Sequence, residues 1–554
     1  MKKNILMWAC FAMAMMPVTS VAQYRSQVWC PDNGDGTYTN PVINADYSDP
    51  DICVGASGKD YYMTASSFNC IPGLPVLHST DLVNWKIVSY AITELEPKEV
   101  FDKPAHGKGV WAPCIRYHHG EYYIYWGDPD YGVFMVKTKD PAGKWEKPVK
   151  VIEGKGMIDT SPLWDDDGRC YLVNGWAGSR AGYKSVLSVR ELTPDGTKAI
   201  SDPVIVFDGN NEHRTAEGPK FYKHDGWYWI MCPAGGVPTG WQLAMRSKNV
   251  YGPYEHKIVL AQGSTEVNGP HQGGWIRTQE GEDWFMHFQK KGCYGRVVHL
   301  QPVTWKDGWP VMGKVPAKGY CGEPYITYNK PKTSGKTVVE NPVESDEFNQ
   351  TKLGLQWQWQ ANYDHTFGQP TAYGYMKLYN HKVAEGDNNL FNVPNMLLQK
   401  TPADEFVATT HLTVAAKGEQ QMGGLIMMGL DYSALVVCRV GDEFQLQQRT
   451  CKGADKNKKE EVQVLATLKA TDADKYNYEP AIYCDVYLRL QVKKGGEMTF
   501  SYSMNGKKYT SVGQMFKMRE GKWIGAKIGL VAAQPAGKAV KGFANVDWFR
   551  VTKK

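Results

Sequence analysis

Residues 157–174 read M-I-D-T-S-P-L-W-D-D-D-G-R-C-Y-L-V-N. A carboxylate, Asp159, opens a strand-like run, and a D-D-G turn joins that run to a second one marked by Tyr171. An Asp-Gly turn between two runs rich in apolar and aromatic residues is a β-hairpin signal. This stretch therefore predicts two antiparallel strands with an acid near the start of the first.

The second half of this hairpin recurs five times in the first three hundred residues. The copies are G-K-D-Y-Y-M-T-A-S (58–66), H-G-E-Y-Y-I-Y-W (119–126), D-G-R-C-Y-L-V-N (167–174), D-G-W-Y-W-I-M (225–231) and G-E-D-W-F-M-H-F (281–288). Their aromatic markers follow one another by 61, 49, 57 and 56 residues, which is near the period of propeller blades. Alternating runs such as V-L-S-V-R-E-L follow the markers, and long amphipathic helical stretches are absent. We predict an all-β fold that begins with a five-bladed β-propeller of four-stranded blades.

The chain changes character after the fifth copy. Residues 328–336 read Y-N-K-P-K-T-S-G-K, a composition typical of a linker. Six further strand-like runs follow, at 406–414, 434–440, 485–492, 498–504, 526–533 and 545–551. We therefore predict a propeller domain over 23–327, a linker over 328–340 and a β-sandwich domain over 341–554.

The N-terminus has the pattern of a signal peptide. Lys2 and Lys3 precede an apolar run from Ile5 to Val18, and small residues follow at the cleavage positions. Residues 1–22 are therefore predicted to be removed on export, which favours a periplasmic enzyme. Cys10 lies inside the apolar run, too early for lipid attachment, so a lipid anchor is not expected. No later run approaches the ~20 apolar residues of a membrane span, and none is predicted.

Charge and cysteine content exclude several classes of protein. The net charge is only +5, from 63 basic and 58 acidic residues, which gives no reason to expect nucleic acid or an anionic membrane as a partner. Eleven cysteines follow the predicted signal peptide, and no two form a C-x-x-C pair, so a zinc ribbon or redox site is not expected. Most should be buried small side chains, although one or two disulfides stay open for an exported protein.

Three carboxylates occupy similar positions in three of the repeats. Asp49 in Y-S-D-P-D-I, Asp159 in M-I-D-T-S-P and Glu217 in T-A-E-G-P-K-F-Y precede their aromatic markers by 12, 12 and 11 residues. The first strand of each propeller blade lines the central channel, so acids in similar phase should meet at one mouth of that channel. Each alone would be an ordinary turn residue, but three in phase predict an acid site.

Converging acids are the equipment of glycoside hydrolysis. Inversion needs a carboxylate base and a carboxylic acid donor about 6.5–9.5 Å apart, with a water between the base and the sugar. A third carboxylate near the donor would raise the donor's pKa. The spacing itself leaves open which acid has which role.

Two further residues fall at the corresponding places in the other blades. Trp111 precedes its marker by 11 residues and His271 by 13. They would offer a stacking platform for a sugar ring and a ligand for a cation, or else serve as a core tryptophan and a structural histidine. The run Asp165–Gly168 resembles part of a calcium loop, but a hairpin turn explains it and the rest of that loop is missing.

Five motifs, taken together, resemble glycoside hydrolase family 43. They are Y-S-D-P-D-I, G-V-W-A-P, I-D-T-S-P-L-W-D-D-D-G, E-G-P-K-F-Y and G-P-H-Q-G-G-W, in order within residues 35–325. The resemblance implies a five-bladed propeller and an inverting hydrolase that mostly acts on chain ends. It implies that Asp49 is the general base and Glu217 the general acid, while Asp159 tunes the donor's pKa and orients the substrate.

The resemblance also implies the residues around these acids. Trp111, Arg296 in Y-G-R-V-V-H-L and Ile158 would contact the sugar. His271 would contact a central cation, often calcium, and no cofactor would be needed for the chemistry. The second domain looks like the concanavalin-like sandwich attached to many of these enzymes, which leaves open whether it completes the pocket. Asp346 and Asp547 are candidates for holding a structural calcium ion there.

The expected substrate is a plant cell-wall oligosaccharide of the arabinoxylan, arabinan or xyloglucan type. The versions H-Q-G-G-W and H-L-Q-P-V-T-W-K-D-G-W-P favour an α-L-arabinofuranosidase that acts on non-reducing ends, with a β-D-xylosidase or a bifunctional enzyme as the alternative. A retaining β-fructosidase is disfavoured because its N-D-P-N-G and R-D-P motifs are missing. A non-catalytic carbohydrate-binding protein is disfavoured because all three acids are present.

Overall fold

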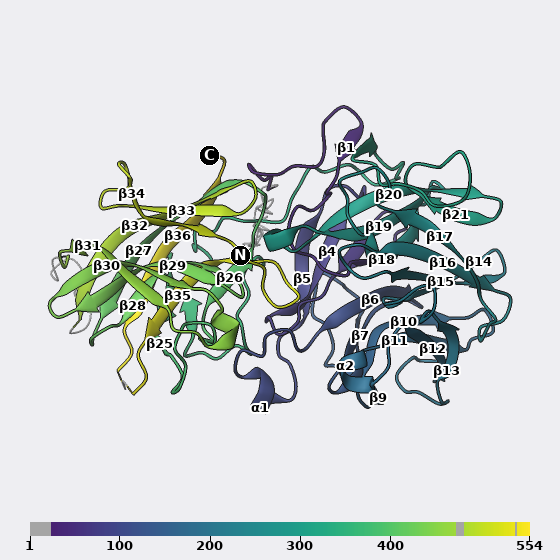
Figure 1. Ribbon diagram of the computed structural model, residues 1–554, viewed down its shortest axis with the longest axis horizontal. Helices are drawn as coiled ribbons and strands as arrows, with labels where there is room; N and C mark the ends of the chain where they lie inside the picture. Colours follow the sequence, from purple (N-terminus) through teal and green to yellow (C-terminus); the bar gives the residue numbers. More distant parts are fainter. Residues whose placement is uncertain (1–23, 472–480, 538–539) are drawn as a thin grey trace, which may run out of the picture.

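The protein consists of two β-rich lobes that lie side by side (Figure 1). The computed structural model describes residues 24–471, 481–537 and 540–554, so the predicted signal peptide lies outside the described residues. The helices are single turns: α1 (Lys98–Phe101), α2 (Gly178–Ala181), η1 (Gly292–Tyr294) and η2 (Ala454–Lys456). Within the described ranges, no helix has the length and apolar character needed to cross a bilayer.

The first lobe is a propeller of five four-stranded sheets, each continuous in sequence and antiparallel. The five blades are β2 (Asp51–Val54), β3 (Tyr61–Thr64), β4 (Gly73–Ser79) and β5 (Lys86–Ile92); β6 (Trp111–His118), β7 (Glu121–Asp128), β8 (Gly132–Thr138) and β9 (Val149–Glu153); β10 (Met157–Trp164), β11 (Cys170–Trp176), β12 (Val186–Leu192) and β13 (Val204–Asp208); β14 (Lys220–His224), β15 (Trp227–Ala234), β16 (Trp241–Ser247) and β17 (Glu255–Ala261); and β18 (His271–Arg277), β19 (Asp283–Lys290), β20 (Arg296–Lys306) and β21 (Trp309–Met312). The predicted all-β fold and the five blades are confirmed.

Tight turns explain how the repeat folds locally. Two-residue turns at His119–Gly120, Asp225–Gly226 and Asp307–Gly308 join neighbouring strands, and both residues of each turn have positive φ. Such turns match the right-handed twist of paired strands, and Gly and Asp tolerate their backbone at low cost. The Asp-Gly pairs seen in the sequence are therefore hairpin turns.

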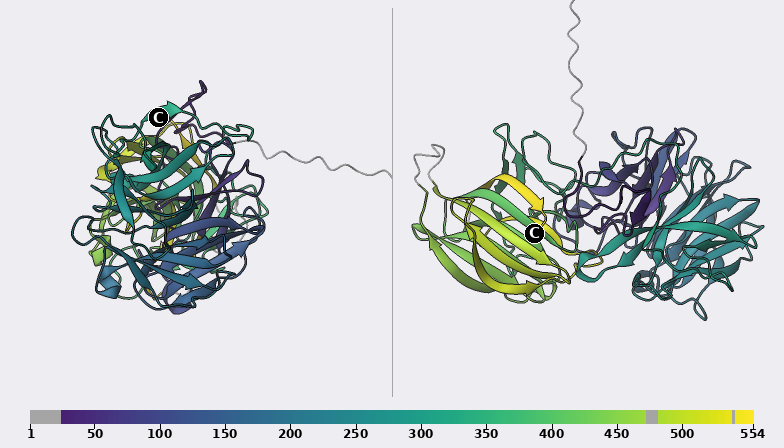
Figure 2. Two further views of the ribbon diagram at one scale, coloured as in Figure 1. Left: turned by 90° about the vertical axis from the view of Figure 1, so that its right-hand side faces the viewer. Right: turned by 90° about the horizontal axis from the view of Figure 1, so that it is seen from above.

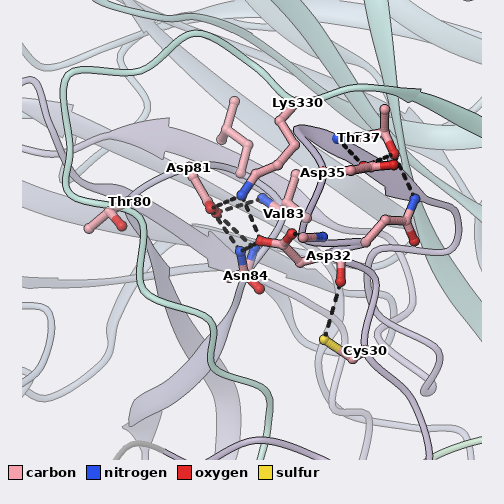
Figure 3. A network of polar contacts seen from close by, with 12 residues as sticks. Cys30, Asp32, Asp35, Thr37, Thr80, Asp81, Val83, Asn84 and Lys330 are labelled. Atoms are coloured by element: carbon pink, nitrogen blue, oxygen red, sulfur yellow. Dashed lines mark hydrogen bonds and ion pairs between the residues drawn. The ribbon is translucent and has the colours of Figure 1, made fainter.

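The propeller is closed by strands from its two ends. β1 (Thr37–Thr39) pairs in antiparallel fashion with β22 (Thr327–Asn329). Just after β22, Lys330 places its Nζ 2.6 Å from Asp32 Oδ2 and 3.1 Å from Asp81 Oδ2, as Figure 3 shows. The start of the segment predicted as a linker is thus attached to the first blade.

The second lobe is a sandwich of two seven-stranded sheets. One sheet has the order β23 (Gly368–Pro370), β24 (Met376–Tyr379), β36 (Phe543–Thr552), β27 (Phe406–Ala416), β32 (Ile482–Lys493), β33 (Glu497–Ser503) and β34 (Thr510–Lys517). The other contains β25 (His381–Lys382), β35 (Lys527–Gln534), β28 (Met422–Met428), β29 (Tyr432–Val440), β30 (Glu443–Cys451) and β31 (Glu461–Leu468), with β26 (Leu397–Lys400) paired to β35. Alternate residues of the two sheets form one apolar core between them.

Backbone contacts join the two lobes, which meet along one face (Figure 2). Ile71 of the propeller and Trp359 of the sandwich exchange two backbone hydrogen bonds, of 3.0 and 2.6 Å. The side chain of Asn362 donates to the Leu95 carbonyl and accepts from the Leu95 N–H. Because these groups are buried, the contacts hold the sandwich at a fixed place beside the propeller.

The cysteines lie mostly inside the two lobes. All eleven cysteines within the described ranges are free thiols, and eight of them are buried. They pack as small apolar side chains, as the sequence predicted.

Candidate active site

The three acids line one pocket at the mouth of the propeller channel. Asp49, Asp159 and Glu217 share this pocket with the predicted sugar-contacting residues Trp111, Ile158 and Arg296. Five residues that were not predicted complete the lining: Phe68, Ala112, Val237, Gln272 and Trp523. The empty space amounts to ≈ 520 Å³ with the open mouth included, and parts of all five blades reach it.

A left-handed backbone residue marks the start of the innermost strand in every blade. These residues are Asp49 (φ 56), Ala112 (φ 32), Asp159 (φ 58), Gly218 (φ 63) and Gln272 (φ 39). In three blades a register shift of the strand pair coincides with it. Such bulges re-aim side chains and are enriched near active sites. The acids differ in their place: Asp49 and Asp159 are the left-handed residues themselves, whereas Glu217 precedes Gly218, which accounts for its spacing of 11.

Asp49 is buried and is held by donors on both carboxylate oxygens. The hydroxyls of Ser48 and Ser66 lie 2.7 and 2.6 Å from Oδ2, and Arg296 Nη1 lies 3.1 Å from Oδ1. Ser66 Oγ also accepts from the Ala112 N–H, and Ser48 Oγ accepts from Arg296 Nη1. Because both hydroxyls already accept elsewhere, their protons point at Asp49. This arrangement suits an ionised carboxylate that accepts a proton.

Asp159 and Glu217 form the second half of the acid site. The Asp159 side chain is buried, and its Oδ2 accepts the Gly218 N–H at 2.7 Å. Burial, then the charges of Glu217 and Asp49, raise the pKa of Asp159 to about 8. The Glu217 side chain is 29% exposed and faces the pocket. Because the two groups interact strongly, the pair retains one proton near neutral pH, and Glu217 is the member that can reach a ligand.

Arg296 and Trp111 occupy the predicted positions beside the acids. The Arg296 guanidinium lies over the Phe288 ring, 5.0 Å from its centroid, and contacts Asp49. Trp111 donates its Nε1–H to the Gly107 carbonyl at 2.9 Å, which fixes the indole at the pocket wall. Both side chains are therefore held in place before a ligand binds.

The sandwich contributes Trp523, which the sequence analysis missed. Trp523 follows β34 in the loop G-K-W-I-G (521–525), and its side chain is 47% exposed. Its ring lies edge to face with Trp111, with the centroids 6.2 Å apart. The neighbouring Lys522 packs so closely on Gly107 that a Cβ there would lie 2.5 Å from Lys522 Cγ. The pocket wall thus continues from the propeller into the sandwich.

A single buried carboxylate ties this loop to the acid site. Asp46 Oδ1 accepts the Arg296 N–H at 2.8 Å, and Asp46 Oδ2 accepts the Gly525 N–H at 3.0 Å. Asp46 is only 2% exposed, so neither N–H can turn to water instead. Asp46 therefore links the backbone that carries Arg296 to the backbone that carries Trp523.

His271, predicted to contact a cation, lies behind Glu217. Its Nε2 is 3.3 Å from Glu217 Oε1, and its Nδ1 is buried with no hydrogen-bond partner among the described residues. Calcium takes six to eight oxygen ligands, and the described chain gathers no three carboxylate, His or Cys ligands at His271. An ion near His271 would therefore take most of its ligands from water, and the central calcium stays a prediction.

The acids suggested for an ion in the sandwich have separate partners. Asp346 Oδ2 accepts from Trp357 Nε1 at 2.9 Å, whereas Asp547 Oδ2 contacts His411 Nδ1 at 3.0 Å. The calcium ion predicted there stays a prediction without support from these contacts.

A potential metal-ligand group lies away from the pocket. In the described part of the chain, the one group of three potential metal ligands is Glu212, His213 and His256. Trp241 Nε1 donates to His213 Nδ1 at 3.3 Å, which puts the histidine proton on Nε2 and disfavours a metal there.

Comparison with known proteins agrees with this architecture. Residues 38–310 match the family model "Glycosyl hydrolases family 43", and residues 345–552 match the model "Beta xylosidase C-terminal Concanavalin A-like domain". A Xylanibacter ruminicola protein named "Putative beta-xylosidase" is 35% identical over 90% of this chain and 86% of its own length. The "Non-reducing end alpha-L-arabinofuranosidase BoGH43B" of Bacteroides ovatus is 31% identical over 75% of this chain and 79% of its own length.

Solved structures show the same two-lobed arrangement. The "GH43 BlXynB protein from Bacillus licheniformis" aligns with a TM-score of 0.78 at 25% identity, over 94% of this chain and all of that chain. "Bacteroides ovatus Xyloglucan PUL GH43B" aligns with a TM-score of 0.77 at 25% identity, with the same coverage.

Proposed function

The chain belongs to glycosyl hydrolase family 43, and we propose that it releases single pentosyl residues, with inversion, from the non-reducing ends of plant cell-wall oligosaccharides. One observation carries the proposal: the three acids lie in a pocket whose wall is shared by the propeller and the sandwich loop. A pocket walled by Trp111 and Trp523 suits a chain end better than the middle of a chain.

Asp49 is the proposed general base. Its carboxylate receives hydrogen bonds from two hydroxyls and from Arg296, and it lies at the pocket surface. A water between this carboxylate and the anomeric carbon would lose its proton to Asp49 as it attacks.

Glu217 is the proposed general acid, with Asp159 as its modulator. An acid that protonates the leaving oxygen must hold its proton near neutral pH. The buried Asp159 shares one proton with Glu217, because two adjacent carboxylates resist ionising together. When Glu217 gives up its proton, Asp159 can neutralise the pair again, and Asp159 is also placed to hydrogen-bond the sugar.

Arg296, Trp111 and Trp523 are the proposed binding residues for the sugar. The guanidinium offers donors to ring hydroxyls, and the two indoles offer apolar faces for C–H groups. These contacts would orient the anomeric carbon between Asp49 and Glu217.

Two glycones are candidates, and the relatives' names include both. The motifs favoured α-L-arabinofuranosyl ends, and the 31% identical relative carries that name. β-D-Xylosyl ends are the second candidate, because the 35% identical relative is named as a β-xylosidase. Measuring kcat/KM on aryl α-L-arabinofuranoside and aryl β-D-xyloside tests the proposal. Turnover of at least one is expected, and turnover of neither would contradict it.

Export is part of the proposed function. The N-terminal sequence Met1–Ala22 has the pattern of a cleavable signal peptide, so we propose that the enzyme trims oligosaccharides in the periplasm. N-terminal sequencing of the protein recovered from that compartment should begin at Gln23.

A further inference from the structure

A second hollow lies at the far end of the propeller channel. Four innermost strands end there, and the last residue of each lines it: His118, Trp164, His224 and Arg277. The same strands begin at the acid pocket, so the two openings are opposite mouths of one channel. β6 spans eight residues, which separates the mouths by about 23 Å. The hollow encloses ≈ 800 Å³ with its open mouth included.

Aromatic rings from several blades line this hollow in fixed orientations. The His118 ring stacks on Trp164 with centroids 4.4 Å apart and an interplanar angle of 12°. His224 packs against Trp305 at 5.0 Å, and the Tyr117 side chain remains 38% exposed at the edge. Rings held by their neighbours give a pre-formed surface for the C–H face of a sugar.

Hydrogen-bond donors lie among these rings. Arg116 is mostly buried beneath the hollow, and its Nε has no hydrogen-bond partner in the described part of the chain. Arg277 reaches the surface with 52% of its side chain exposed. An unpaired buried donor and a free rim donor can each be satisfied by a ligand hydroxyl.

The charges of the hollow favour a neutral ligand. Each lysine or arginine that lines it already has a carboxylate partner: Arg116 with Asp51, Lys223 with Asp165 and Asp166, and Arg277 with Asp283 at 3.7 Å. Burial and the neighbouring His119 lower the pKa of His118, which keeps this ring neutral at neutral pH. No surplus positive charge remains to hold a uronate or a phosphate.

We propose that this far mouth is a second carbohydrate-binding site, which holds a neutral stretch of the polysaccharide whose ends the acid pocket trims. The choice of polysaccharide rests on the proposed function, whereas the site itself rests on the rings, donors and charge balance of the hollow. Such a site would keep the enzyme on its polymer between cleavage events without contributing to the chemistry.

Affinity electrophoresis of the full chain tests the proposal. The parent protein carries Asp49→Asn, so that the gel polysaccharide is not cleaved, and the gels contain neutral arabinoxylan, neutral arabinan or polygalacturonate. Tyr117→Ala and Arg277→Ala are added to the parent one at a time. Tyr373→Ala, at a tyrosine of the sandwich that is 81% exposed, is the matched control.

A neutral polysaccharide should retard the parent, and each far-mouth variant should weaken its apparent Kd about fivefold or more. Tyr373→Ala should leave the Kd unchanged, and Arg277→Ala in the active enzyme should cleave an aryl pentoside at the full rate. Unchanged retardation in both far-mouth variants, or no retardation of the parent, would overturn the proposal. Retardation by polygalacturonate alone would overturn the neutral-ligand assignment.

The same experiment separates this site from the proposed function. If the active enzyme cleaves neither aryl pentoside but Arg277→Ala still weakens retardation, the proposed function fails and the far-mouth site stands. If the enzyme cleaves a pentoside while retardation does not depend on Tyr117 or Arg277, the far-mouth proposal alone fails.

Discussion

The propeller and the sandwich contribute to one pocket in different ways. The propeller supplies Asp49 and Asp159, which are buried and hydrogen-bonded at positions that its repeat places around the channel. The sandwich supplies Trp523, which is nearly half exposed and lies on a loop between strands. The repeat can bring acids together because its blades share an axis, whereas a side chain that only widens or narrows the pocket can come from any domain that packs nearby. The comparison suggests that the propeller determines the chemistry and the sandwich affects which sugar end binds.

Removing a propeller acid should have the largest effect. Asp49→Asn and Glu217→Gln should each lower kcat/KM on an oligosaccharide by about 10²–10⁴-fold or more, since each removes proton transfer in the transition state. Asp166→Asn, at an 88% exposed side chain of the same domain, is the control and should retain full activity. Steady-state kinetics measures the difference, and near-native activity in either acid variant would remove that acid from the mechanism.

Asp159→Asn should change the pH dependence as well as the rate. In the native enzyme, kcat/KM should fall as the pH rises through about 8, where the Asp159–Glu217 pair loses its shared proton. Without the neighbouring carboxylate, Glu217 should ionise more easily, so the basic limb should move to lower pH. A pH profile of kcat/KM measures this, and a basic limb that stays in place would show that Asp159 does not tune the donor.

Trp523→Ala should have a smaller effect, mainly on binding. Loss of one aromatic contact of about 0.5–1.5 kcal/mol should raise KM roughly twofold to tenfold, with kcat changed much less. Tyr373→Ala in the same domain should change neither parameter. A fall in kcat as large as that of the acid variants would contradict the division of labour between the two lobes.

Asp46→Asn should resemble Trp523→Ala, because the asparagine keeps only one acceptor for the two N–H groups that Asp46 binds. We expect KM to rise about threefold to tenfold, in line with an unsatisfied buried donor that displaces the loop. The double variant should show less than the summed effect if both residues act through the loop. Additive effects in this cycle would show that Asp46 does not position Trp523.

The smallest expected effect is on stability. The pKa of Asp159 is raised in the folded state, so its contribution to stability is fully present below the unfolded pKa of about 3.9 and is lost as the pH rises through about 8. Asp159→Asn removes this loss and should raise the Tm at pH 8–9 by about 2–4 °C relative to native, with little gain at pH 4. Thermal unfolding at both pH values measures it, and equal shifts would contradict the assignment of the raised pKa.

The propeller and its acids were predictable because both follow from a repeat. Turn residues such as Asp225 and Gly226 have a local backbone preference, and the acids keep nearly constant distances from the aromatic markers. The one-residue offset of Glu217 was visible as a spacing of 11, but its cause is the left-handed residue Gly218, which the sequence pattern does not mark.

Trp523 could not be predicted in the same way. Its position depends on the contacts of its loop with Asp46 and Gly107, which are far away in the sequence. The only local signal is an aromatic residue between two glycines in G-K-W-I-G, a pattern that also fits an ordinary surface loop. The packing of the two lobes therefore had to be known before the pocket wall could be completed.

The most direct test of the division into base and acid compares two leaving groups on the same variants. An activated aryl pentoside needs little help from a general acid, whereas an oligosaccharide needs it fully. We predict that Glu217→Gln cleaves the activated substrate far better than the oligosaccharide, and that Asp49→Asn is equally impaired on both. Equal impairment of Glu217→Gln on both substrates, or recovery of Asp49→Asn on the activated one, would contradict the account.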